Sequence, residues 1–167
     1  MPPVSASEGC CPTTLVDWAA AVAPTDIDLV WERARPFIES ALGRADERFS
    51  VSKVKEWLHT NRAALFLYGH DLGESGYPLN VTAALVATSH VREWGMSLLI
   101  LAFGADELAE VLPSLQFIEL FALARGYATV ELRAVSGRRG WIRVLAPFGY
   151  RHVGNDEDGD AILLKDI

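Results

Sequence analysis

Cysteine is nearly absent from this chain of 167 residues. Its two cysteines, Cys10 and Cys11, are adjacent, and a disulfide between neighbours is strained. Because no third cysteine can pair with either, the sequence predicts a protein of a reducing compartment. The four histidines are scattered and lack the spacing of metal ligands, so no metal site is predicted.

Long hydrophobic runs and an excess of positive charge are also missing. No stretch approaches the ~20 uninterrupted apolar residues of a membrane span. The start, Met1-Pro2-Pro3, has neither the cationic residues nor the apolar segment of a secretory signal. The chain has 15 Lys and Arg residues and 22 Asp and Glu residues, which gives a net charge of −7. Binding to phosphate backbones requires a cationic excess, so we expect no direct nucleic-acid partner and no membrane.

The chain has enough hydrophobic residues, half of the total, for one domain with a sizeable core. Residues 1–24 differ from the rest because they are rich in Pro, Ser, Thr and Ala. We interpret them as an N-terminal arm that stays out of the sheet, and residues 25–167 as the domain. Leu15, Val16 and Trp18 form a short apolar patch, which predicts protein partners or self-association through this arm.

Hydrophobic periodicity predicts the order α-α-β-β-β-α-β-α-β-β. The apolar run Met96 to Phe103 is expected to be a central strand, and Tyr127 to Ala134 a parallel neighbour. A helix over residues 106–125 joins them, with Asp106 as its N-cap and Pro113 dividing it. The fold class is therefore α+β (α/β), with a mixed, mostly antiparallel central sheet and helices on both faces.

The second half of this order resembles the GNAT family of N-acetyltransferases. The segment Leu145-x-Pro147-x-Gly149-Tyr150 is similar to the end of the last GNAT helix, and Gly137-Arg138-Arg139-Gly140-Trp141 resembles small acetyltransferase-like proteins of tailed phages. The resemblance covers residues 27–165. It implies a wedge between the two central strands, with acetyl-CoA as the cofactor if the protein is an enzyme. It also implies a virion or the host cytoplasm as the location.

Two departures from the family pattern bear on function. The family's glycine-rich pyrophosphate loop is reduced to Phe103-Gly104-Ala105-Asp106, and Asp106 brings a negative charge where phosphates would lie. The tyrosine that often serves as general acid corresponds to Leu145. These absences favour a non-catalytic, phage-type protein acting as a virion, structural or interaction component. The alternative is an acetyl-CoA-dependent N-acetyltransferase acting on an amine.

Candidate site residues follow from the same resemblance. His90 and Glu93 end a strand where GNAT enzymes place a general base, although a strand-end His or Glu is commonly only surface. Trp141 heads an apolar stripe and is expected to anchor the last helix on the sheet, with stacking against a ligand as the alternative. Cofactor contacts are assigned to six residues: Phe103, Gly104, Ala105, Asp106, Arg138 and Arg139. More often, however, such a pair at a helix start is solvated, bridges to acids such as Glu131 or forms a protein contact.

Overall fold

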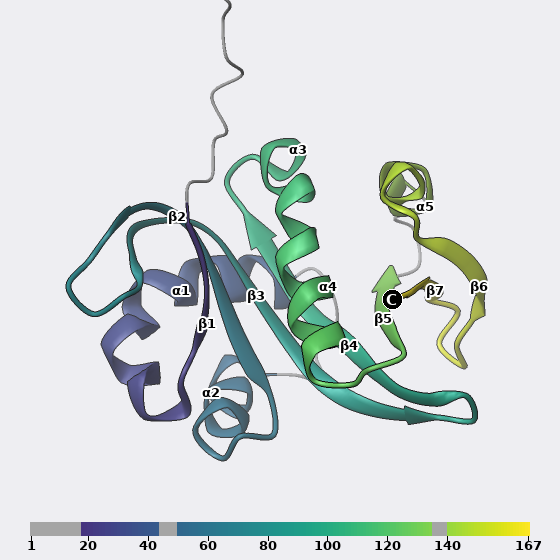
Figure 1. Ribbon diagram of the computed structural model, residues 1–167, viewed down its shortest axis with the longest axis horizontal. Coiled ribbons are helices and arrows are strands. Elements are labelled where there is room, and N and C mark those ends of the chain that lie inside the picture. The colour runs from purple at the N-terminus through teal and green to yellow at the C-terminus, as the bar shows by residue number, and fades with distance from the viewer. Residues whose placement is uncertain (1–17, 44–49, 135–139) are drawn as a thin grey trace, which may run out of the picture.

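The computed structural model describes residues 18–43, 50–134 and 140–167 (Figure 1). The strands are β1 Trp18–Val22, β2 Ala64–Leu72, β3 Pro78–Arg92, β4 Gly95–Ala105, β5 Thr129–Ala134, β6 Arg151–Asn155 and β7 Ala161–Asp166. The α-helices are α1 Ile27–Leu42, α2 Val51–His59, α3 Leu108–Val111, α4 Leu115–Ala124 and α5 Gly140–Leu145. Short 3₁₀ turns are η1 Pro24–Asp26, η2 Leu112–Ser114 and η3 Ala146–Phe148.

The described strands form one seven-stranded sheet in the order β1-β2-β3-β4-β5-β7-β6. Strands β4 and β5 pair in parallel, and every other neighbouring pair is antiparallel. This mixed, mostly antiparallel sheet confirms the predicted fold class and the predicted parallel central pair.

Helices cover both faces of the sheet, as predicted (Figure 1). On one face, α1 and α2 pack against β1 to β4 through a core that includes Val30, Ile38 and Leu65. On the other, α3, α4 and α5 pack over β2 to β7 through a core that includes Leu115 and Leu132. Both cores are apolar and buried, so hydrophobic burial holds the two helical layers to the sheet.

Strand β1 corrects the expectation that residues 1–24 stay out of the sheet. Residues Trp18 to Val22 pair antiparallel with β2, from Trp18 opposite Gly69 to Val22 opposite Leu65. The side chain of Val22 is buried in the α1–α2 core, which explains why this alanine-rich segment is held as an edge strand. Leu15 and Val16, the other members of the predicted apolar patch, lie outside the described residues.

The helical segment between β4 and β5 is divided at Pro113, as the sequence predicts. The four-residue α3 ends at Val111, and the 3₁₀ turn that contains Pro113 leads into α4. Proline suits this place because its missing N–H is not needed in a first turn. Asp106, however, is not the N-cap: Glu107 occupies that position, and no side chain of the described residues caps α3.

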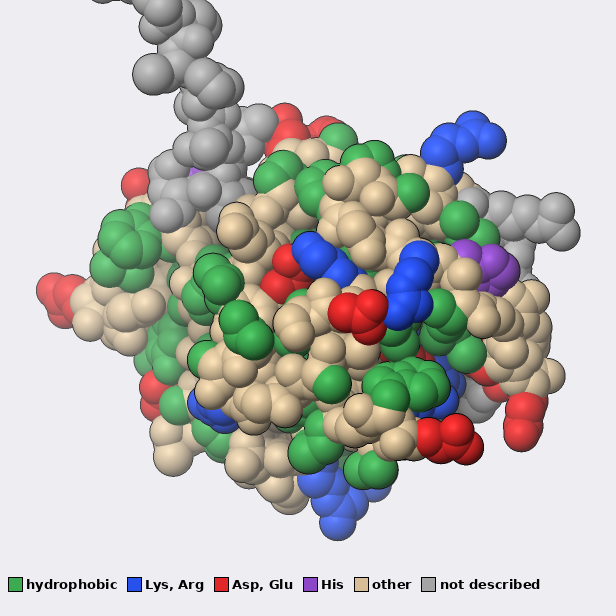
Figure 2. Space-filling view, turned by 45° about the vertical axis from the view of Figure 1, so that its right-hand side comes forward, with side chains coloured by type: hydrophobic (Ala, Val, Ile, Leu, Met, Phe, Trp, Pro, Cys, Tyr) green, Lys and Arg blue, Asp and Glu red, His purple; other side chains and the backbone are tan. Residues whose placement is uncertain are grey.

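The surface over the α4 and α5 side carries both signs of charge. Figure 2 shows Lys and Arg side chains interspersed with Asp and Glu among hydrophobic ones, without a continuous basic area on the face that it displays. No helix in the described part of the chain is long and apolar enough to cross a membrane.

Candidate active site in the opening between β4 and β5

The two central strands are joined along only part of their length. Pairing between them runs from Ser97 opposite Thr129 to Ile100 opposite Leu132. Beyond that point β4 continues to Ala105, but it is no longer paired with β5. Leu101 is an extra residue in the ladder with β3, because Val86 pairs with Ala102 and Ala87 with Ile100. A β-bulge bends its strand, so β4 bends where its pairing with β5 stops.

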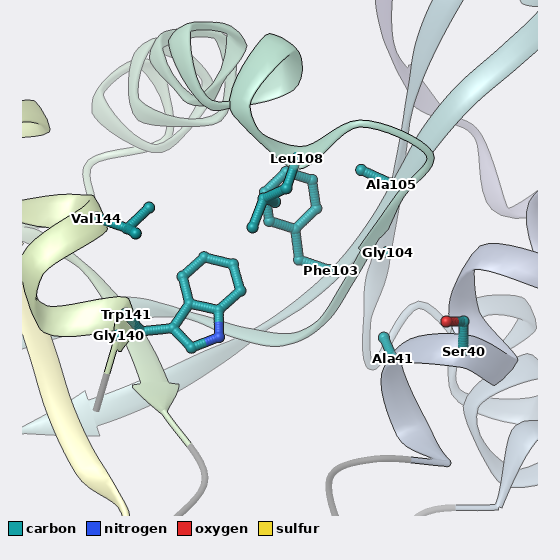
Figure 3. Close-up of a pocket in the computed structure, with 9 residues that line it drawn as sticks. All are labelled: Ser40, Ala41, Phe103, Gly104, Ala105, Leu108, Gly140, Trp141 and Val144. Carbon is teal, nitrogen blue, oxygen red and sulfur yellow. The ribbon is translucent and has the colours of Figure 1, made fainter. Parts of the chain in front are cut away.

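A pocket of about 370 Å³ occupies this opening. Strand β4 forms one wall, α5 faces it, and the end of α1 and the start of α3 close the sides (Figure 3). In Figure 3 the rings of Phe103 and Trp141 extend into the space from opposite sides. The lining residues are Ser40, Ala41, Phe103, Gly104, Ala105, Leu108, Gly140, Trp141 and Val144.

Gly104 allows α1 to reach the pocket. A Cβ atom at this position would lie 2.1 Å from the carbonyl oxygen of Phe37, which is closer than real atoms approach. The absence of a side chain therefore lets the α1 backbone lie directly against β4. This contact brings Ser40 and Ala41, three and four residues after Phe37, to the edge of the pocket.

Most of the side chains that line the pocket are apolar. Among its residues, only Ser40 and Trp141 have side chains with a hydrogen-bonding group, and none is charged. Asp106 and Glu107 follow directly after the β4 wall, and both are exposed. The Asp106 amide donates to the carbonyl of Thr82 at 3.0 Å, so it is already engaged. The pocket thus suits an uncharged segment of a ligand. The protein itself places negative charge beside the pocket, at the start of α3.

Comparison with known proteins finds likeness at the level of structure. No protein-family model matches the sequence, and no curated protein matches it. A GNAT-family acetyltransferase from Listeria monocytogenes 4b F2365 superposes with a TM-score of 0.59 at 16% identity, covering 90% of this chain and 94% of that one. An N-acetyltransferase from Staphylococcus aureus Mu50 gives 0.62 at 15%, with coverages of 89% and 96%.

A third solved structure is the PaiA N-acetyltransferase from Thermoplasma acidophilum in complex with coenzyme A. It superposes with a TM-score of 0.59 at 12% identity and covers 90% of this chain and 99% of that one. The chain has the GNAT fold.

The GNAT-fold neighbours correct the functional expectation. We expected a non-catalytic virion, structural or interaction component, and that hypothesis is wrong: the three structures named above are acetyltransferases, and the Thermoplasma protein is in complex with coenzyme A. The comparisons contain no support for the phage, virion or structural-protein part of the prediction.

Three of the six predicted cofactor residues line the opening between β4 and β5, but they lie in a strand rather than in a loop. Phe103, Gly104 and Ala105 line the pocket, but they belong to β4 itself rather than to a connection after it. Asp106 lies next to this wall. Arg138 and Arg139 lie outside the described residues.

The predicted base residues are far from this pocket. His90 pairs with Ser97, which is six residues before Phe103 on β4, a separation of about 20 Å. Glu93 lies in the turn between β3 and β4, still farther along. The structure therefore does not bring His90 or Glu93 together with Phe103, Gly104 and Ala105.

Several lining residues were not predicted as site residues. Ser40 and Ala41 come from α1, and only the tertiary contact at Gly104 places them here. Trp141 was expected to anchor α5 on the sheet, and it does pack against the α4-side core. Its indole also faces the pocket, which the apolar stripe of α5 alone could not indicate.

A buried polar cluster lies beneath α4, near Phe103. It joins Tyr68 of β2, Tyr150 and the ion pair between Lys165 Nζ and Glu119 Oε2 at 2.6 Å. Burial raises the pKa of both tyrosines, and the nearby Glu119 carboxylate raises each pKa further. The hydroxyl of Tyr150 interacts with the Glu119 carboxylate, whereas the hydroxyl of Tyr68 has no hydrogen-bond partner within the described part of the chain. Both tyrosines therefore stay neutral, and Tyr68 buries a polar group without a partner.

Replacing Tyr68 with phenylalanine is expected to raise the free energy of unfolding by about 1 kcal/mol, because it removes a buried hydroxyl that has no partner among the described residues. Tyr77 provides the opposite case. Its hydroxyl donates to Asp26 Oδ2 at 2.7 Å and accepts from the Ala23 amide at 3.2 Å. Tyr77→Phe should therefore lower stability by about 1 kcal/mol. Urea unfolding of the two variants measures both effects, and a loss of stability in Tyr68→Phe would contradict the prediction.

Proposed function

We propose that this protein is an acetyl-CoA-dependent N-acetyltransferase that transfers an acetyl group to an amine. The observation that carries the proposal is the pocket in the opening between β4 and β5, which is lined by uncharged side chains and has Phe103, Gly104 and Ala105 as one wall. The coenzyme A complex of a protein with the same fold supports it.

The residues present fit the thioester end of such a cofactor. The pantetheine arm is mostly aliphatic with two amides, and the pocket offers apolar walls from Phe103, Leu108 and Val144. Beyond Ile100, β4 has a backbone edge that does not pair with β5 and can hydrogen-bond with amides. Bound acetyl-CoA would supply a thioester to the amine.

The fit is poorer at the phosphate end. Asp106 and Glu107 are exposed beside the start of α3, and like charge there opposes a pyrophosphate. The exposed position of both carboxylates lets water and salt screen this repulsion. Because no described side chain caps α3, its first amides are not occupied by a capping oxygen. That Arg138 and Arg139 contact the phosphates remains a prediction from the sequence.

The chain's own groups at the pocket are few. The backbone of β4 would hold the thioester end, and the hydroxyl of Ser40 and the indole N–H of Trp141 are the lining side-chain groups that can hydrogen-bond. The acceptor is an amine of unspecified structure, and the resemblance to the phage subgroup stays a prediction.

Acetyl-CoA binding tests the proposal. At 100 times its dissociation constant, acetyl-CoA should stabilise the protein by about 2.7 kcal/mol. Trp141→Ala removes one wall of the pocket and should weaken binding in calorimetry about tenfold, a loss of about 1.4 kcal/mol. Trp57→Ala is the matched control, since Trp57 is also half-buried but packs on the α1–α2 side of the sheet.

Acetyl-CoA binding by the wild type and the two variants has two outcomes that decide the proposal. Binding by the wild type and by Trp57→Ala, but weaker binding by Trp141→Ala, supports the pocket as the acetyl-CoA site. No heat and no stabilisation at millimolar acetyl-CoA would overturn the proposed function.

A further inference from the structure

The pocket between β4 and β5 has two parts with different walls. In the upper part of Figure 3, Leu108 and Val144 form the apolar walls that fit a pantetheine arm. Ser40 and Ala41 appear on the right, with Trp141 facing them from the left. A pantetheine arm between the upper walls leaves the space between α1 and Trp141 for the acceptor amine.

The last turn of α1 gives its side of the pocket a partial negative charge. Ser40 and Ala41 belong to this turn of the 16-residue helix. The C-terminal end of a helix carries about half of a negative elementary charge, because its final carbonyl groups have no partner within the helix. A basic residue in the last turn would offset this charge, but α1 has none there. The α1 edge of the pocket therefore favours a cation.

Two aromatic rings face the same space. Phe103 of β4 and Trp141 of α5 extend into the pocket from opposite sides (Figure 3). The Phe103 ring lies against Tyr68, with 6.4 Å between the ring centroids, and Trp141 packs against the α4-side core. The face of an aromatic ring attracts an ammonium group, and tryptophan attracts it most strongly. The two rings thus suit a ligand that is both cationic and apolar.

Negative charge next to the pocket adds to this preference. Asp106 and Glu107 follow directly after the β4 wall, and both are exposed. Glu39 precedes Ser40 on α1, although its carboxylate is already paired with Arg35 at 3.5 Å. The whole chain has a net charge of −7, so its field raises the local concentration of cations. A substrate with a carboxylate beside its amine would be repelled at this position.

We propose that the acceptor is a primary amine with an apolar or aromatic body and no carboxylate, which binds as its ammonium between the last turn of α1 and Trp141. This inference rests on the proposed function, because it names the class of amine for the same site. The ammonium donates a hydrogen bond to the Ser40 hydroxyl, which points toward the pocket in Figure 3. The rings of Phe103 and Trp141 hold the ammonium and the carbon atoms next to it.

Calorimetry with three matched probes tests the class of ligand. Phenethylamine carries the ammonium, phenethyl alcohol has a hydroxyl in its place, and the free amino acid phenylalanine adds a carboxylate. Each probe is titrated into the full chain, both free and saturated with coenzyme A. Phenethylamine should bind about tenfold more tightly than either of the other two, because it alone has the cation without the anion.

A charge variant tests the position of the ammonium. Ser40 is exposed, so Ser40→Lys should fold, and it places a second cation in the last turn of α1. Phenethylamine binding should weaken about tenfold by repulsion, whereas coenzyme A binding should not weaken, because its phosphates are anionic. Glu39→Gln is the matched control. It changes the charge of the same turn by the same amount on a residue that does not line the pocket, so phenethylamine binding should change less than about threefold.

Equal affinity for phenethylamine and phenylalanine would overturn the inference, as would a Ser40→Lys protein that binds phenethylamine as tightly as the wild type. Absence of phenethylamine binding at millimolar concentration, with and without coenzyme A, would also overturn it. A protein that binds acetyl-CoA but not phenethylamine keeps the proposed function and loses this inference. A protein that binds phenethylamine but not acetyl-CoA keeps the ammonium site and loses the proposed function.

Discussion

Replacing Arg92 with methionine is expected to lower the free energy of unfolding by about 3–5 kcal/mol. Arg92 ends β3, and its guanidinium Nε donates to Glu131 Oε2 at 3.0 Å while Nη2 contacts Oε1 of the same carboxylate. The side chain of Glu131 is completely buried on β5. Without Arg92, Arg133 is the one cation among the described residues that still contacts the carboxylate, with its Nε 3.5 Å away. Desolvation of the charge is then poorly compensated.

The size of this effect comes from removing one partner of a buried pair rather than from the pair itself. Replacing both partners with apolar residues of similar volume is often nearly neutral. The double variant Arg92→Met, Glu131→Leu should therefore recover most of the stability lost in Arg92→Met. Urea unfolding with a two-state fit measures both variants.

Arg35→Met serves as the control, because Arg35 pairs with Glu32 and Glu39 on the exposed surface of α1. Such surface pairs contribute about 0–1 kcal/mol. If Arg92→Met costs no more than Arg35→Met, Glu131 does not depend on Arg92 and the explanation is wrong.

Much of the fold could be predicted from the sequence because its central elements carry strong local signals. The continuous apolar run that forms β4 predicted a central strand, and Pro113 marked the division between α3 and α4. Strand β1 was missed because its composition is typical of an arm, and its identity as a strand depends on pairing with β2. Edge strands of this kind are decided by their partner rather than by their own residues.

The candidate site could be predicted only in part, for a similar reason. Phe103, Gly104 and Ala105 were found because they follow the central strand, where the GNAT resemblance places the cofactor. The contribution of α1 could not be predicted from the sequence. Ser40 reaches the pocket because Phe37 of α1 contacts Gly104 of β4, and these two residues are 67 positions apart in the sequence. His90 and Glu93 were misplaced relative to the pocket because the length of the β3–β4 hairpin decides which end they occupy.

Gly104→Ala is expected to destabilise the protein by about 3 kcal/mol, because it places a methyl group where the α1 backbone lies. The new Cβ would be 2.1 Å from the Phe37 carbonyl oxygen and 2.6 Å from its carbon, so neither can be relieved by turning a side chain. Either α1 moves away from β4 or β4 shifts, and both movements displace the wall that holds Ser40 and Ala41. Acetyl-CoA affinity should therefore fall together with stability.

Gly140→Ala is the matched control for this effect. Gly140 lines the same pocket from α5, and a Cβ there would meet no atom within 4 Å. Gly140→Ala should therefore leave the free energy of unfolding within about 0.5 kcal/mol of the wild-type value. Urea unfolding and calorimetry with acetyl-CoA on the two variants measure the contrast. A Gly104→Ala protein as stable as Gly140→Ala would mean that α1 does not lie against β4, and Ser40 and Ala41 would then not belong to the pocket.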